Sequence, residues 1–162
     1  MILLSLLDES TIKTDLESED KEELFEELVT LLVKARKRED RSKILECLWD
    51  REKKGSTGIG KGVAIPHGKT GAVEQIAAVL GISKEGIEYE SLDGEPVHIV
   101  FLMVAKEGIT GPHLEALSDI AALVETPGFC RKMREVADSR EALDLIKSYA
   151  IEIQETRNAR DN

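Results

Sequence analysis

Apolar residues recur at helical spacing in two neighbouring segments of the first third of the chain. Over residues 19–37 they fall three or four positions apart and the remaining face is charged, a pattern typical of an amphipathic helix. Acids gather in its first turns and basic residues in its last turn, as the helix dipole favours, and Ser18 or Asp20 can cap its start. A second helix is predicted over residues 41–53, and Gly55 ends it.

Two later segments are almost continuously apolar. Residues 75–83 and residues 97–105, which read VHIVFLMVA, show no helical period and contain few polar side chains. Such runs are typical of strands that are buried on both faces of a sheet. Helices must therefore cover the sheet from both sides, and residues 92–96 (LDGEP) form a turn between the strands.

The remainder of the chain returns to helical spacing. Pro112 suits the first turn of a helix that extends to residue 125, and further helices are predicted over residues 129–137 and 140–153. We find no internal repeat and no linker, so the sequence predicts a single α/β domain over residues 1–155. Residues 156–162 are expected to form a disordered tail.

Composition narrows the class of function. The chain has 162 residues, with 22 Lys and Arg against 32 Asp and Glu, which gives a net charge of −10. This balance argues against nucleic-acid binding, which needs a concentrated basic surface. The apolar start, interrupted by Ser5 and followed by acids, has the features of neither a signal peptide nor a membrane span. We therefore expect a cytoplasmic protein without membrane insertion, with Cys47 and Cys130 as buried core thiols.

Candidate chemistry concentrates in a glycine-rich segment and in the histidines. Residues 55–71 read GSTGIGKGVAIPHGKTG, and His67 follows a proline in this segment. His113 occupies the first turn of a predicted helix, where the backbone favours an anion. His98 lies in an apolar strand and is interpreted as structural. Each of His67 and His113 alone fits an ordinary surface histidine, but together they suggest an anion site built around neutral imidazoles.

Two nucleotide-binding motifs and a metal site fail on spacing. The segment Gly68-Lys69-Thr70 resembles the end of a Walker A sequence, but the required earlier glycine is displaced and an apolar strand follows. The G-x-G-x-G run from Gly58 lacks the spacing of a dinucleotide fingerprint. Two distant histidines without a third ligand do not form a zinc site. We therefore predict no cofactor and no metal.

The glycine-rich segment carries a resemblance that extends over nearly the whole chain. Residues 51–68, REKKGSTGIGKGVAIPHG, resemble the active-site signature of the fructose/mannitol-type enzyme IIA domains of the bacterial phosphoenolpyruvate-dependent phosphotransferase system. Within that family the chain is most similar to the nitrogen-regulatory IIA proteins. The opening ILLSLLDESTI, the DGEPV turn and the HLxxL helix follow in the family's order. The resemblance implies that family's α/β fold, a mixed β-sheet with helices on both faces.

The same resemblance implies a role for three residues. His67 corresponds to the histidine that accepts a phosphoryl group from the carrier HPr, and His113 to a second histidine that supports it. Arg51 corresponds to a positive group near the phosphate, although a helix-end arginine can also bond a C-terminal carbonyl. Ser56 or Thr57 can add a hydroxyl donor or satisfy backbone groups.

Two functions follow from the resemblance. The first is a phosphocarrier that accepts phosphate from phospho-HPr on His67 and passes it on or acts as a nitrogen-type regulatory switch. The alternative is the IIA component of a fructose/mannitol-type uptake system that donates to a separate IIB protein. We favour regulation because no IIB or membrane IIC segment follows the last predicted helix. The expected docking rim for HPr comprises Ile59, Val63, Ile65, Ile109 and Leu114.

Overall fold

A mixed β-sheet with helices on both faces organises the chain. The computed structural model describes residues 1–37 and 40–162. The strands are β1 (Ile12–Lys13), β2 (Gly58–Gly60), β3 (Val63–Ala64), β4 (His67–Lys69), β5 (Ala77–Ile87) and β6 (Val97–Ala105). Their order is β1-β5-β6-β3-β2, and β4 also pairs with β6. The β5–β6 pair is antiparallel, whereas β3 and β4 run parallel to β6, so the predicted mixed sheet is confirmed.

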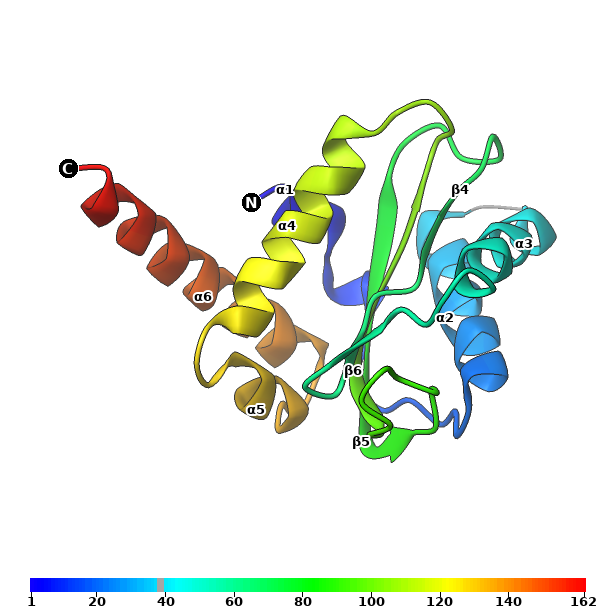
Figure 1. Cartoon of the computed structure of the whole chain (residues 1–162), viewed down its shortest axis with the longest axis horizontal. Helices are drawn as coiled ribbons and strands as arrows, with labels where there is room; N and C mark the ends of the chain where they lie inside the picture. The colour runs from blue at the N-terminus through cyan, green and yellow to red at the C-terminus, as the bar shows by residue number, and fades with distance from the viewer. Residues whose placement is uncertain (38–39) are drawn as a thin grey trace.

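The helices form two groups on opposite faces of this sheet (Figure 1). On one face lie α2 (Lys21–Arg36) and α3 (Arg41–Glu52), and on the other lie α1 (Ile2–Leu6), α4 (Gly111–Glu125), α5 (Phe129–Arg134) and α6 (Ser139–Arg160). A 3-10 turn, Glu9–Thr11, connects α1 to β1. The predicted arrangement of helices above and below the sheet is therefore confirmed.

The position of β6 between two layers of helices explains why nearly every residue of this strand is apolar. Ile99, Phe101 and Met103 belong to the core beneath α1, α4, α5 and α6. The residues that alternate with them belong to the core beneath α2 and α3, and they are Val100, Leu102 and Val104. Successive side chains of a strand point to opposite faces, so a strand covered on both sides needs apolar residues throughout.

Helix boundaries agree closely with the capping signals. Asp20 caps α2, because its carboxylate accepts a hydrogen bond from the Glu23 amide at 2.9 Å. The helix ends at Arg36, and its C-cap residue Lys37 adopts the left-handed conformation with φ of 52°. The N-terminal apolar segment forms α1, which packs on α4, and the Leu3 amide donates to Asp119 Oδ2 at 3.1 Å.

The structure differs from the sequence-based prediction at three places. The glycine-rich segment, whose sequence predicted only a loop, contains the strands β2, β3 and β4. Cys47 and Cys130 are partly exposed and not fully buried. The expected disordered tail is wrong as far as Arg160, because α6 continues to that residue. Residues 154–160 are mostly good helix formers, and the Gln154 side chain donates to Asn158 Oδ1 at 3.0 Å across one turn.

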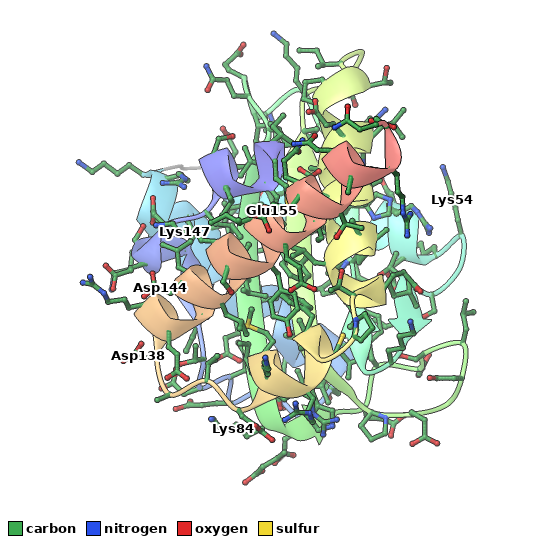
Figure 2. All side chains as sticks on the ribbon, turned by 90° about the vertical axis from the view of Figure 1, so that its left-hand side faces the viewer. Lys54, Lys84, Asp138, Asp144, Lys147 and Glu155 are labelled. Carbon is green, nitrogen blue, oxygen red and sulfur yellow. The ribbon has the colours of Figure 1, made fainter. Side chains whose placement is uncertain are left out.

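Helix α6 carries a charged outer side along its length. Figure 2 shows Asp144, Lys147 and Glu155 on this helix, and all three are exposed.

Within the described residues, no helix is long and apolar enough to cross a membrane.

Candidate functional site

His67 lies at the start of β4, beside the end of β6. Its backbone pairs in parallel register with Met103, which fixes the position of the residue at one edge of the sheet. The Nδ1 atom of the ring lies 2.7 Å from the Ile65 carbonyl oxygen. A carbonyl oxygen only accepts hydrogen bonds, so Nδ1 carries the proton and Nε2 keeps its lone pair. His67 therefore has the tautomer in which Nε2 is the nucleophilic nitrogen.

A close approach of α3 to β4 brings further side chains to His67. A Cβ atom on Gly68 would lie 2.7 Å from Cys47 Sγ and 2.8 Å from the Cys47 carbonyl oxygen, distances that no real Cβ tolerates. Glycine at this position allows the helix to pack directly on the strand. The C-terminal end of α3, with Arg51, thus reaches the same depression as His67.

His113 approaches His67 from the other helical layer. It lies in the first turn of α4, whose start is favoured by a proline at the preceding position. Its side chain is buried, with 4% of the residue exposed, and its ring centroid lies 5.3 Å from that of His67. The Nδ1 atom of His113 is buried and has no hydrogen-bond partner within residues 1–37 and 40–162. The predicted pair of histidines is therefore brought together by strand β4 and helix α4.

Together these residues form an open depression of about 420 Å³. It is lined by Cys47, Asp50, Arg51, Lys54, His67, Gly68, Lys69, His113, Leu114 and Leu117. Three of the lining residues are cationic, so the depression is locally basic although the chain has a net charge of −10. Lys54 extends from the loop after α3 at the edge of the molecule (Figure 2). Such a surface suits a phosphoryl group or another anion.

Lys54 and Lys69 line the depression, but no sequence motif identified them as site residues. Lys54 follows Arg51 by three positions just after α3, and Lys69 is two residues beyond His67 in the strand. Once His67 is considered a site residue, the sequence shows one lysine close to it and another close to Arg51. Their meeting depends on the packing of α3 against β4, which no local pattern encodes.

The expected docking rim is only partly correct. Leu114 lines the depression and is 62% exposed. Val63 and Ile65 are buried in the core beneath α4 and cannot contact a partner. Ile59 and Ile109 are exposed but do not line the depression that contains His67.

Both histidines are held in the neutral form. Burial lowers the pKa of His67, and the charges of Arg51 and Lys69 lower it further against the opposing effect of the Ile65 carbonyl. Burial lowers the pKa of His113 to about 4, with smaller effects from His67 and Lys69. A neutral imidazole at physiological pH is the form that can act as a nucleophile.

Arg51 bonds a backbone carbonyl and also faces the depression. Its Nη1 atom donates to the Gly55 carbonyl oxygen at 3.0 Å, so the side chain closes the turn after α3. The residue also lines the His67 depression and lowers the pKa of that histidine. A guanidinium has five N–H donors, so one bond to a carbonyl leaves donors for an anion.

The residues of the depression do not resemble a metal centre. Across the described parts of the chain, no group of three or more His, Cys, Asp or Glu side chains is placed to hold a metal ion. The geometry instead combines a nucleophilic imidazole, a neighbouring neutral imidazole and several cations. Phosphoryl transfer to a histidine uses groups of these types.

Comparison with known families agrees with this class of site. The family model for "Phosphoenolpyruvate-dependent sugar phosphotransferase system, EIIA 2" matches residues 5–149. The chain therefore belongs to this family of IIA phosphocarriers, as its sequence motifs predicted.

Individual relatives fall into two branches of the family. The chain is 35% identical to a nitrogen regulatory protein of Bradyrhizobium diazoefficiens, over 90% of this chain and 95% of that protein. It is 42% identical to the fructose-specific EIIABC component of Bacillus subtilis, over 92% of this chain but 24% of that longer protein. The chain thus spans about a quarter of the fructose-specific relative.

Solved structures show the same fold. The crystal structure of the nitrogen regulatory protein IIA-Ntr from Neisseria meningitidis superposes with a TM-score of 0.83 and 33% identity, over 90% of this chain and 99% of that chain. The mannitol IIA structure from Escherichia coli has a TM-score of 0.74 and 20% identity, over 86% of this chain and 98% of that one.

Proposed function

We propose that His67 accepts a phosphoryl group from the phosphohistidine of HPr and later passes it to a protein acceptor. The observation that carries this proposal is the bond from His67 Nδ1 to the Ile65 carbonyl, because it leaves Nε2 with its lone pair in a depression lined by cations. The lowered pKa of His67 supports the proposal, since protonation of Nε2 would remove the nucleophile.

The transfer step follows from this tautomer. The Nε2 lone pair attacks the phosphorus of the donor phosphohistidine and forms a new N–P bond. The donor N–P bond breaks, and its electron pair returns to the donor imidazole. The proton on Nδ1 of His67 stays in place, hydrogen-bonded to the Ile65 carbonyl at 2.7 Å. No proton has to leave His67 during the transfer.

The neighbouring residues stabilise the charge that arrives. Arg51, Lys54 and Lys69 line the depression and can neutralise the phosphoryl oxygens. His113, with its pKa near 4 and its ring 5.3 Å from that of His67, stays neutral and can donate a hydrogen bond from one ring nitrogen. We assign His113 the supporting role and His67 the acceptor role, because His113 is 4% exposed whereas His67 is only partly buried and is the more accessible to a donor protein.

Two acceptors are compatible with this chemistry. We favour a regulatory protein target in the cytoplasm, supported by the match to 95% of the Bradyrhizobium nitrogen regulatory protein. The second candidate is a IIB protein of a sugar uptake system, favoured by the 42% identity to the fructose-specific component. A complex of mannitol IIA with phosphorylated IIB is also a structural neighbour, at 20% identity.

The proposed function is tested by incubating the protein with phosphoenolpyruvate, enzyme I and HPr. We expect the intact mass to increase by one phosphoryl group, with an acid-labile and base-stable adduct. Nuclear magnetic resonance of the labelled ring should place the phosphorus on Nε2 of His67. Omission of HPr is the control. An unchanged mass in the complete mixture, or phosphorus on Nδ1, would contradict the proposal.

A further inference from the structure

A buried polar cluster lies at the C-terminal end of α3, next to Arg51 in the sequence. Glu52, the last residue of α3, is 7% exposed, and its Oε1 accepts a bond from the Thr57 amide at 3.0 Å. Its Oε2 accepts a bond from the Thr57 hydroxyl at 2.6 Å. Tyr89, fully buried, has its hydroxyl 2.6 Å from Thr57 Oγ1. None of these groups takes part in the transfer step.

The direction of each hydrogen bond is determined by the chemistry of the groups. The Thr57 hydroxyl donates its single proton to Glu52 Oε2, because a carboxylate oxygen accepts hydrogen bonds. The Tyr89 hydroxyl then donates to Thr57 Oγ1 at 2.6 Å and also lies 3.4 Å from Glu52 Oε2, and burial raises the pKa of Tyr89 so that it keeps its proton. Lys21, the first residue of α2, completes the cluster with its Nζ 2.9 Å from Glu52 Oε1. Its ammonium also lies 4.6 Å from the centroid of the Tyr89 ring.

This cluster connects the α3–β2 connection to two segments that are distant from it in the sequence. Lys21 begins α2, Glu52 ends α3, Thr57 precedes β2 and Tyr89 follows β5. A buried carboxylate is stable only when its charge and lone pairs are satisfied, and here both oxygens have partners. The position of the end of α3 is therefore set by directed bonds as well as by apolar packing.

The turn between Glu52 and Thr57 is closed from both of its ends. The Gly55 amide donates to the Glu52 carbonyl oxygen at 3.1 Å. The Gly55 carbonyl oxygen accepts the bond from Arg51 Nη1 at 3.0 Å. Glu52 and Thr57 thus fix the same turn on which the Arg51 guanidinium rests.

We propose that Glu52, Thr57 and Tyr89 form a positioning unit that holds Arg51 at the His67 depression. The unit acts through Arg51 and touches no reacting atom. This inference rests on the proposed function, because positioning of Arg51 has a kinetic consequence only if a phosphoryl group arrives at His67. It also explains why the glutamate and the threonine accompany the arginine in the REKKGST segment.

A double-mutant cycle tests the coupling to Arg51. Thr57→Val keeps the shape of the side chain and removes the hydroxyl, and we expect the rate of phosphorylation by phospho-HPr to fall about tenfold, as for a misplaced site group. In the background of Arg51→Gln, the same substitution should change the rate less than about twofold, because coupled residues are not additive. Thr57→Ser, which restores the hydroxyl, should return the rate toward that of the parent protein. An equal loss from Thr57→Val in both backgrounds would overturn the proposal.

A second variant and a second readout keep the inference separable from the proposed function. Tyr89→Phe removes one hydroxyl and should lower the rate less than Thr57→Val does, with the same dependence on Arg51. The Nε–H resonance of the Arg51 guanidinium should shift in Thr57→Val and remain in place in Thr57→Ser. Absence of phosphorylation in the parent protein would overturn the proposed function. An unmoved Arg51 resonance in Thr57→Val would overturn the positioning unit, whatever the labelling result.

Discussion

Two histidines at opposite ends of β6 show how the same side chain serves different purposes. His98, near the start of the strand, has Nδ1 2.9 Å from the Ser83 carbonyl oxygen and Nε2 3.0 Å from Arg134 Nη2. His67, beside the end of the strand, has the same type of Nδ1 bond, to Ile65. Its Nε2 lies in a depression lined by cations.

The difference lies in the second nitrogen. In His98 the carbonyl forces the proton onto Nδ1, so Nε2 accepts from Arg134 and both nitrogens are engaged within the protein. In His67 the same tautomer leaves the Nε2 lone pair for a ligand. A backbone carbonyl at Nδ1 therefore selects the tautomer, and the group opposite Nε2 decides between a structural and a reactive histidine.

The largest expected effect comes from removing His67, with removal of His98 as the matched control. His67→Ala should abolish the phosphohistidine adduct, because it removes the nucleophile itself. His98→Ala should retain the adduct and lower the melting temperature, since it removes two hydrogen bonds. Intact mass after incubation with phospho-HPr distinguishes the two variants. Labelling of His67→Ala at the parent rate would show that the assignment of His67 is wrong.

A smaller effect on the phosphorylation rate is expected from substitution of Arg51, with Arg134 as the control. Arg51→Gln should slow phosphorylation about tenfold or more, because a cation near the transferred phosphoryl group is lost. Arg134→Gln, which alters the partner of His98, should leave the rate unchanged. Stopped-flow transfer from phospho-HPr measures both. An unchanged rate for Arg51→Gln together with a lower melting temperature would show that Arg51 acts only through its hydrogen bond to the Gly55 carbonyl.

The buried His113 predicts a pH dependence of stability. Its pKa is about 4 in the folded chain and 6.5 in the unfolded one, so only the unfolded chain gains the proton between these values. The free energy of unfolding should therefore fall as the pH drops from 6.5 to 4, by up to about 3 kcal/mol. His113→Ala should flatten that slope, as urea titrations at several pH values can show. Parallel curves for the two proteins would contradict the lowered pKa.

His113→Ala also separates support from nucleophilic attack. The variant keeps His67 and should still become phosphorylated, but onward transfer should slow or the adduct should hydrolyse faster. The lifetime of the isolated phosphoprotein measures this. Complete loss of labelling, as expected for His67→Ala, would contradict the division of roles between the two histidines.

The smallest effect concerns partner docking at the rim of the depression. Leu114 is 62% exposed and lines the depression, so Leu114→Glu should weaken transfer from HPr on the order of threefold. Leu92→Glu is the matched control, because Leu92 is 79% exposed and lies outside this lining. Initial rates at subsaturating HPr compare the two variants. Equal rates would place the docking face elsewhere.

The local sequence was most informative where one physical signal acted alone. The apolar residues of β6 predicted a strand buried on both faces, and Asp20 marked the start of α2. The glycine-rich segment was harder, because β2, β3 and β4 are two or three residues long and obtain their hydrogen bonds from β6 and from each other. Short strands rich in glycine have no periodicity that identifies them before the sheet exists.

The sequence by itself determined the chemical groups of the site: His67, His113 and Arg51 could be named from their motifs. Only the tertiary structure decided that Lys54 and Lys69 share the depression and that Glu52 bonds Thr57. It also decided which nitrogen of His67 is free, through the Ile65 carbonyl. The physical reason is that the sequence directly gives the type of each residue. Its pKa value, its tautomer and the charges around it depend on burial and on neighbours that folding brings from distant segments.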